Sequence, residues 1–463
     1  MPPNSFYKRF YHKGLPSKGD LYCIRLNRQK DYIYHVVFEN PTKYLSLIMS
    51  NLTTKPAFTD KKFLITIIFV TSLFMFWGIA ITMADVLNKH FQNTMSLSKL
   101  QSGFVQFAVF GAYGVMGIPA GLFMKRFGYK KGVLLGLSLF AVGAFLFIPA
   151  ANVSSFAFFA VALFVVGCGL STLETVAHPF VASLGDQRTS DLRINFAQTF
   201  NAVGTMLGPI IGGYFLLSNT VEGSTDLTSV KILYGVIGTI ILLVAVSFSF
   251  VKVPELTDPH AANPEDLASS NVDVAPEKSL FSHKHFVWAV VAQFFNVAAQ
   301  AGTWAFFINY SHEIIGLESS KASYYMGGFF MGMMLAGRII GTFVMRYIAA
   351  NKLLAAFAFA NIVMCLIVAQ GYGMVSFIAL LMINFFFSIM FPTIFSLGLK
   401  NLGKHTQQAA SFISMGVVGG AFFPFLMGFV ADSFGVAHAY YLPIICYFVI
   451  FLFGYKFYKV TKS

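Results

Sequence analysis

The stretch GVLLGLSLFAVGAFLFIPAANVSSFAFFAVALFVVGCGLSTL, residues 132–173, contains no Asp, Glu, Lys or Arg in its forty-two positions. An α-helix needs about 20 apolar residues to cross the hydrocarbon core of a bilayer. The stretch is therefore long enough for two membrane-spanning helices. The small and polar residues of PAANVSS (149–155) indicate the turn between them.

The composition of the whole chain agrees with this reading. Of its 463 residues, 56% are hydrophobic and only 11% are charged, whereas an ordinary soluble domain carries about 25% charged residues. Similar uncharged runs recur along the chain, and the longest of them divide at turn residues. We predict an all-α membrane protein with twelve spans, at about 62–87, 99–124, 131–150, 155–182, 195–217, 231–251, 285–311, 322–347, 352–370, 374–399, 407–431 and 436–458.

The net charge of +13 does not point to nucleic acid, because the basic residues gather in alternate loops. They follow spans 2, 4, 8 and 10 and the last span, whereas the loops after spans 3, 9 and 11 hold none. These residues are Lys125, Arg126, Lys130, Lys131, Arg188, Arg193, Arg346, Lys352, Lys400, Lys404, Lys456, Lys459 and Lys462. Cytoplasmic loops of membrane proteins collect Lys and Arg. We therefore expect a multi-pass inner-membrane protein with both termini in the cytoplasm.

The first sixty residues are expected to form a cytoplasmic segment. Residues 1–48 are basic, aromatic and unpatterned, and they lack the long apolar core of a signal peptide. Met49 opens an ordinary polar lead into span 1. Our hypothesis is that natural translation begins at Met49, which makes residues 1–48 a start-site artefact or a disordered tail. The four cysteines are scattered and suggest neither a disulfide framework nor a metal site.

The predicted spans fall into two sets of six. Residues 252–284 form a long polar insert, which we interpret as a cytoplasmic linker between an N-terminal half at 61–251 and a C-terminal half at 285–463. The halves echo each other, since HPFVASLG (178–185) matches FPTIFSLG (391–398) in the position of its proline and its Ser-Leu-Gly. Paired six-helix halves are typical of transporters whose substrate binds between them near the bilayer midplane.

Several motifs resemble those of the fucose/galactose/glucose–proton symporter family of the major facilitator superfamily. They include LETVAHPFV (173–181), RINFAQTFNAVG (193–204), AQAGTWAFFINY (299–310) and MFPTIFSLGLKNLG (390–403). The resemblance extends over residues 60 to 460. It implies the major facilitator fold with two pseudo-symmetric halves, and import of L-fucose or a related hexose such as glucose, galactose or N-acetylglucosamine by proton symport with alternating access.

Glu174 ends the apolar run quoted above. A charged side chain at bilayer depth is costly, by about 2.5 kcal/mol or more, and such residues are usually functional. A carboxylate can avoid this cost by binding a proton, as a proton-coupled carrier requires. The alternative is a structural glutamate paired with a neighbouring helix. The resemblance implies a proton-coupling role for Glu174.

Two further ionisable residues attract attention. Apolarity alone places Asp85 at the outer end of span 1, where it could simply cap a helix. The resemblance implies instead that span 1 continues toward Phe91 and that Asp85 takes part in both proton coupling and sugar binding. His178 shares a helix face with Glu174, and it either modulates the proton affinity of that glutamate or fills space ahead of Pro179. Family members usually carry asparagine at this position.

Sugars are recognised by planar amides, which bond hydroxyl groups in pairs, and by aromatic rings, which cover the apolar face. The predicted spans contain such side chains at Gln198, Asn201, Asn296, Gln300, Trp304, Asn309 and Asn384, with further rings at Trp77 and Phe307. Any one of them could serve instead as a helix–helix hydrogen bond or packing residue. We predict the set, together with Asp85, as the substrate-binding site.

The sequence offers no phosphate loop, metal-ligand cluster or nucleophile–histidine pair, so we expect a protein that is not an enzyme and has no cofactor. The expected partners are a sugar, a proton and the lipid bilayer, and we expect a monomer. Two alternatives remain open. One is a drug–proton antiporter of the same fold, since GTMLGPIIGG (204–213) resembles an antiporter motif. The other is a sugar sensor that binds without transporting.

Overall fold

A computed structural model describes residues 22–23, 35–36, 58–59, 61–185, 190–218, 226–253, 279–345, 347–400, 402 and 406–459. The chain divides into two units, residues 1–57 and 58–463. In the first unit, β1 (Tyr22–Cys23) pairs antiparallel with β2 (His35–Val36). The predictions for most of residues 1–48 and for the greater part of the linker, 254–278, lie outside the described residues.

The second unit is a bundle of long apolar helices. Within the described residues, twelve helices are long and apolar enough to cross a membrane, as predicted. The first six spans are formed by η2 (Lys61–Phe63) with α2 (Leu64–Met95), α3 (Lys99–Ser102) with α4 (Phe104–Phe127), α5 (Tyr129–Val153), α6 (Phe156–Ser183), α7 (Ser190–Gly212) with the π-helical turn η4 (Gly213–Leu217), and α8 (Thr228–Phe250).

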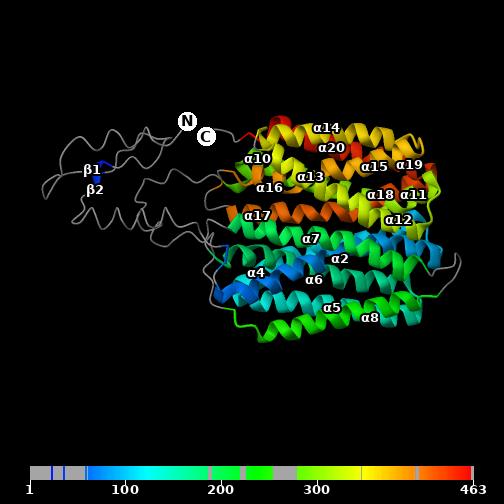
Figure 1. Ribbon diagram of the computed structural model, residues 1–463, viewed down its shortest axis with the longest axis horizontal. Helices are drawn as coiled ribbons and strands as arrows, with labels where there is room; N and C mark the ends of the chain where they lie inside the picture. Colours follow the sequence, from blue (N-terminus) through cyan, green and yellow to red (C-terminus); the bar gives the residue numbers. More distant parts are fainter. Residues whose placement is uncertain are drawn as a thin grey trace. The chain divides into compact units, whose positions relative to one another are not determined.

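The last six spans are more often interrupted. They comprise η5 (Leu280–Ser282), α10 (Lys284–Ala305), α11 (Phe307–Ile315), α12 (Ser319–Tyr325), η6 (Met326–Phe330), α13 (Met331–Val344), α14 (Ala350–Ala369), α15 (Met374–Phe387), α16 (Met390–Gly398), α17 (Thr406–Met415), η8 (Gly416–Val418), α18 (Gly419–Phe434), α19 (Val436–Ala439), α20 (Leu442–Leu452) and η9 (Phe453–Phe457). Figure 1 shows the helices of both sets lying side by side. The fold is the twelve-helix, two-half arrangement predicted.

We name the two ends of the bundle after turns in the first half. At the Ser96 end, α2 finishes at Ser96, which adopts a left-handed φ of 52°. At the Gly128 end, α4 passes into α5 at Gly128, whose φ of 83° favours glycine. Because successive spans reverse direction, the turns after odd-numbered spans lie at the Ser96 end and those after even-numbered spans lie at the Gly128 end.

Span 1 is longer than the predicted limit at residue 87. Helix α2 continues to Met95, as the family resemblance implied for the segment around Asp85. The additional turns contain the polar residues Asn88, His90 and Thr94, all of which are buried. Hydropathy ends the span too early because these side chains face protein partners, whereas hydropathy assumes that they need water.

Arg193 also differs from its prediction as a loop residue. It lies within α7 and is fully buried. Its Nε donates to the Val181 carbonyl at 3.0 Å and its Nη1 donates to the Phe58 carbonyl at 3.0 Å. The guanidinium therefore satisfies backbone acceptors next to the end of α6. Of the other predicted cations, Arg188, Arg346, Lys404 and Lys462 lie outside the described residues.

Glycines allow α2 and α7 to pack backbone against backbone. A Cβ atom at Gly204 would fall on the Met75 carbonyl, and one at Gly208 would fall on the Thr82 hydroxyl. From α2, a Cβ at Gly78 would fall on the Asn201 carbonyl. Small residues at such crossings permit close helix contact in membranes, so this pair fixes the positions of Asp85 on α2 and Gln198 on α7.

Candidate functional site

Glu174 lies on α6, in the first half of the protein, and is half-buried. The Tyr113 hydroxyl of α4 lies near its carboxyl group. The Trp77 indole of α2 donates to that hydroxyl at 2.6 Å. One carboxyl oxygen of Glu174, Oε2, is buried without a hydrogen-bond partner. Since buried polar atoms are normally paired, this oxygen is placed to take a proton or a ligand hydroxyl.

His178 links α6 to α7, one turn after Glu174. Its Nδ1 lies 2.9 Å from the backbone carbonyl of Glu174, and its Nε2 lies 2.8 Å from Nε2 of Gln198. A carbonyl oxygen only accepts, so Nδ1 carries the hydrogen and Nε2 accepts from the Gln198 amide. The contact of His178 with Glu174 is thus made through the backbone carbonyl of Glu174.

Asn201 follows Gln198 on α7 and faces α2. It is buried, and its Nδ2 donates to the Phe74 carbonyl at 3.1 Å. The Phe74 ring in turn meets the His178 ring edge-on, with 5.0 Å between ring centroids. The predicted residues Glu174 and His178 on α6 are therefore brought together with Gln198 and Asn201 on α7, next to α2.

Asp85 heads a second polar group on α2. It is only 3% exposed, and its Oδ1 accepts from Nε2 of Gln106 on α4 at 3.1 Å. Oε1 of Gln106 accepts from Asn88 at 2.9 Å. Oδ1 of Asn88 accepts from Gln92 at 2.7 Å. Oε1 of Gln92 accepts from Nδ2 of Asn309 at 2.8 Å, so the chain of bonds ends in the other half.

The candidates on the last six spans form a third group. The Trp304 indole on α10 donates to Oδ1 of Asn384 on α15 at 3.1 Å, and Nδ2 of Asn384 donates to the Phe330 carbonyl at 2.8 Å. Asn296, also on α10, is fully buried, and neither of its amide atoms has a partner. Gln300 is half-buried one turn further on. Among the described residues, no hydrogen bond joins this group to Glu174.

The two halves hold each other at the Ser96 end. Both oxygens of Asp432 on α18 accept backbone N–H groups at the start of α3, from Lys99 at 3.0 Å and Leu100 at 2.8 Å. The Lys99 ammonium lies 3.0 Å from Glu313 of α11. Ser323 of α12 donates to the Pro209 carbonyl of α7 at 2.5 Å. These bonds join the two halves at the Ser96 end.

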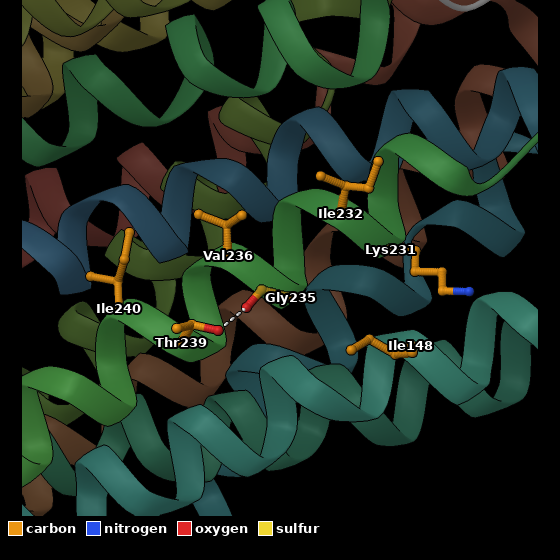
Figure 2. A pocket seen from close by; sticks show the side chains of 7 residues that line it. All are labelled: Ile148, Lys231, Ile232, Gly235, Val236, Thr239 and Ile240. Carbon is orange, nitrogen blue, oxygen red and sulfur yellow. Dashed lines mark hydrogen bonds between the residues drawn. The ribbon is translucent and has the colours of Figure 1, made fainter.

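An apolar groove of about 410 Å³ lies between α5 and α8 (Figure 2). Its lining residues are Ile148, Lys231, Ile232, Gly235, Val236, Thr239 and Ile240. The polar groups at the groove are engaged, since Lys231 donates to Asn152 and the Thr239 hydroxyl donates to the Gly235 carbonyl. None of the predicted site residues lines it. Within the described residues, no cluster of three His, Cys, Asp or Glu could hold a metal ion.

Sequence reasoning missed five residues of these groups, Asn88, Gln92, Gln106, Tyr113 and Asp432. The signals were present for three of them. Asn88 and Gln92 follow Asp85 at three and seven positions, which places them on its helix face. Gln106 is an amide within an uncharged span, the property that selected Gln198. Tyr113 and Asp432 carry no such signal, because tyrosines are frequent here and Asp432 lies at a span end.

The twelve-span fold in two halves, with carboxyl groups and amides buried between its helices, defines a secondary membrane transporter. The family model described as Major Facilitator Superfamily matches residues 63–417. The chain belongs to that superfamily, and within it to the group of L-fucose–proton symporters and glucose/galactose transporters.

Individual relatives are similar over most of the chain. An L-fucose-proton symporter of Escherichia coli is 37% identical over 420 residues, which cover 86% of this chain and 94% of the relative. A glucose/galactose transporter of Brucella abortus is 34% identical over 389 residues, covering 83% and 92%. The crystal structure of the transporter FucP in the outward conformation matches with a TM-score of 0.64 and 36% identity, over 87% of this chain and all of that one.

Proposed function

We propose that this protein is a proton-driven sugar importer of the inner membrane, which carries L-fucose or a related hexose. Glu174 and Asp85 take up the proton, and sugar binds to Asp85 and to amides and rings of both halves. The observation that carries the proposal is the buried, unpaired Oε2 of Glu174. The relatives supply the substrate class, since they are named as an L-fucose-proton symporter and a glucose/galactose transporter.

The surroundings of Glu174 support its role as proton carrier. Tyr113 is the polar side chain that lies near this carboxyl group. The nearby His178 ring has both nitrogens engaged, with the Glu174 carbonyl and with Gln198. No described cation is bonded to the Glu174 carboxyl, so a proton is the simplest way to neutralise it at this depth. Neutralisation then permits the two halves to rock.

The sugar site is proposed to lie between Gln198 and Asn201 of the first half and Asn296, Gln300 and Trp304 of the second. The two unpaired amide atoms of Asn296 and the exposed part of Gln300 support this. Asn384 orients the Trp304 indole, which would cover the apolar face of a sugar ring. Asn309 is better explained as a contact between halves, because its amide donates to Gln92.

The basic loops imply that the Gly128 end and both termini face the cytoplasm. The bonds of Asp432, Lys99 and Ser323 at the Ser96 end then correspond to a state closed to the outside. Import requires this end to open, to admit a proton and a sugar, and to close again before both are released inside. A reporter fused after Ser270, in the linker, should behave as cytosolic; periplasmic behaviour would overturn this topology.

Counterflow in proteoliposomes tests the function directly. Proteoliposomes that contain the purified protein are loaded with unlabelled L-fucose, glucose, galactose, mannose or N-acetylglucosamine. Uptake of the same labelled sugar from the outside is then followed. Transient accumulation of at least one of them supports the importer. Binding without counterflow supports a sensor. Absence of both, with stabilisation of the protein by hydrophobic cations, supports a drug–proton antiporter.

A further inference from the structure

The hydrogen bonds between Asp85 and Asn309 run in one direction. Each amide donates toward Asp85 and accepts from the next residue, in the order Gln106, Asn88, Gln92 and Asn309. Along α2, from Asp85 to Gln92, the chain advances seven residues, or about 10 Å toward the Ser96 end. It begins at a carboxyl group in the first half and ends at the bond that joins the halves.

Two fixed acceptors set this direction. An ionised carboxylate only accepts hydrogen bonds, so Asp85 requires the NH₂ group of Gln106 to face it. The backbone carbonyl of Ser102 likewise only accepts, and Nδ2 of Asn88 donates to it at 3.0 Å. With Gln106 and Asn88 oriented in this way, Oδ1 of Asn88 faces Gln92, and Oε1 of Gln92 faces Asn309. Reversal of any one amide would bring two donors or two acceptors face to face.

The row of hydrogen bonds from Asp85 to Asn309 is shielded from water for most of its length. Asp85, Asn88, Gln106 and Asn309 are all at least nine-tenths buried, and Gln92 is half-buried. Hydrogen bonds in such surroundings strengthen one another, and an unpaired member is costly. While Asp85 is ionised, the bond that it accepts from Gln106 is also charge-assisted, which makes it about twice as strong as a neutral one. A change at Asp85 therefore reaches the amides that follow it.

The geometry points to a relay in which Gln106, Asn88 and Gln92 couple the charge of Asp85 to the bond between Gln92 and Asn309, and so to closure of the Ser96 end. Gln106, Asn88 and Gln92 are positioning residues. The charged carboxylate anchors the chain and favours the closed end. A neutral side chain at position 85 anchors it less firmly and favours opening. The inference rests on the proposed function only for the source of that change, a proton.

Other charged and titratable groups also lie near this end of the bundle. Lys99 pairs with Glu313, and Asp432 accepts from the start of α3. Lys89 and His90 lie on α2 itself, within one and a half turns of Asp85. His90 faces the Leu216 carbonyl, which lies 2.8 Å from its Nδ1. The test therefore alters position 85 directly and uses no change of pH.

The opening of the Ser96 end can be reported by Ser323→Cys. Ser323 is fully buried and bonded to the other half through Pro209, so a cysteine there reacts with a membrane-impermeant maleimide only when the halves separate. The parent protein without this substitution gives the background from the native cysteines. Labelling rates are measured in proteoliposomes without sugar, so that a failure of sugar transport leaves the readout intact.

We combine Asp85→Asn with a substitution that interrupts the row of hydrogen bonds, as a double-mutant cycle. In the reporter protein, Asp85→Asn should raise the labelling rate at least about twofold, the lower end of couplings within one hydrogen-bond network. In reporter proteins that also carry Gln106→Met or Gln92→Met, Asp85→Asn should have no further effect. The two breaks lie at different points of the chain, so either one decides the result if the other variant fails to fold.

Gln370→Met is the matched control for these breaks. Gln370 lies at the same end of the bundle and donates to the Tyr441 hydroxyl at 2.8 Å, outside the chain. The Asp85→Asn effect should persist in that background. If Asp85→Asn had the same effect with and without Gln106→Met or Gln92→Met, the relay would be overturned. An Asp85→Asn variant whose labelling rate equals that of the reporter protein would overturn it as well. Counterflow measured in parallel shows separately whether the proposed function holds.

Discussion

Gln198 and His178 face each other between α7 and α6, with 2.8 Å between their Nε2 atoms. Because the Glu174 carbonyl holds the hydrogen on Nδ1 of His178, the amide of Gln198 must donate. The orientation of Gln198 is thus set by a residue one turn from the candidate proton carrier. Its Oε1 remains available to accept from a sugar hydroxyl.

Substitution of Gln198 by alanine should weaken sugar binding. It removes a candidate ligand, so that a sugar hydroxyl lacks its partner in the complex, which should cost about 1–3 kcal/mol, or about 5- to 150-fold in Kd. We expect the same range for Gln300→Ala, measured by equilibrium binding to purified protein. Gln370→Ala serves as the control with unchanged affinity. Unaltered binding in both candidate variants would place the sugar elsewhere.

Asn201→Ala should affect both stability and binding. Its Nδ2 bridges α7 to the Phe74 carbonyl of α2, so its loss removes a hydrogen bond between the two helices and should lower the free energy of unfolding by about 0.5–1.5 kcal/mol. Thermal unfolding in detergent, followed with and without sugar, separates the two effects. If Asn201 only holds the helices, the stabilisation by sugar will equal that of the wild type although the unliganded protein melts earlier.

Glu174→Gln should uncouple sugar movement from proton movement. Glutamine keeps the shape and hydrogen-bonding capacity of the side chain but mimics permanent protonation, so the variant should still bind sugar and exchange it across the membrane. It should no longer accumulate sugar against a gradient, and sugar addition should no longer alkalinise the medium. Uptake driven by an imposed proton gradient, compared with counterflow, measures the difference.

Asp85→Asn provides the comparison for Glu174→Gln. Since Asp85 is also proposed to touch sugar, its variant should lose binding affinity as well as coupling. Full proton-driven accumulation by Glu174→Gln would mean that this glutamate is structural and that Asp85 or another group carries the proton.

Asp432→Ala should loosen the Ser96 end. It removes the acceptor of two backbone N–H groups at the start of α3. The site is exposed, so we expect a loss of about 0.3–1 kcal/mol and a rise of about two- to fivefold in labelling of Ser323→Cys. Glu318→Ala is the control, because its pairing with Lys321 is long, at 3.7 Å, and exposed. Equal labelling rates in the two variants would argue against a latch at Asp432.

Gly204→Ala should destabilise the fold, whereas Gly111→Ala should not. A methyl group at Gly204 meets the Met75 backbone, which cannot move without separating α7 from α2. Overpacking of this kind costs about 1–3 kcal/mol. A methyl group at Gly111 meets nothing within 4 Å. The melting temperatures of the two variants in detergent check this contrast, and equal values would mean that α2 and α7 are not held at the spacing described.

The sequence by itself determined the spans and the residues most unusual within them. A bilayer requires each spanning segment to satisfy its own backbone hydrogen bonds, so uncharged runs such as residues 132–173 have few structures open to them. Carboxyl groups inside such runs are costly, and Glu174 therefore stood out. Apolarity placed Asp85 only at the end of span 1, because Asn88 and His90 ended the apolar run early. The family resemblance alone placed it well inside the span.

The tertiary structure alone decided which polar groups meet. An amide in a span can bond a neighbouring helix, a sugar or another amide, and its sequence position does not choose among them. Contacts between helices settled that Asn309 bonds Gln92 of the other half and that His178 binds the backbone of Glu174. They also joined Asp85 to Gln106. Such partners depend on how separate spans pack, for example where Gly204 lets α7 approach α2. Hydropathy describes each span alone and does not predict this packing.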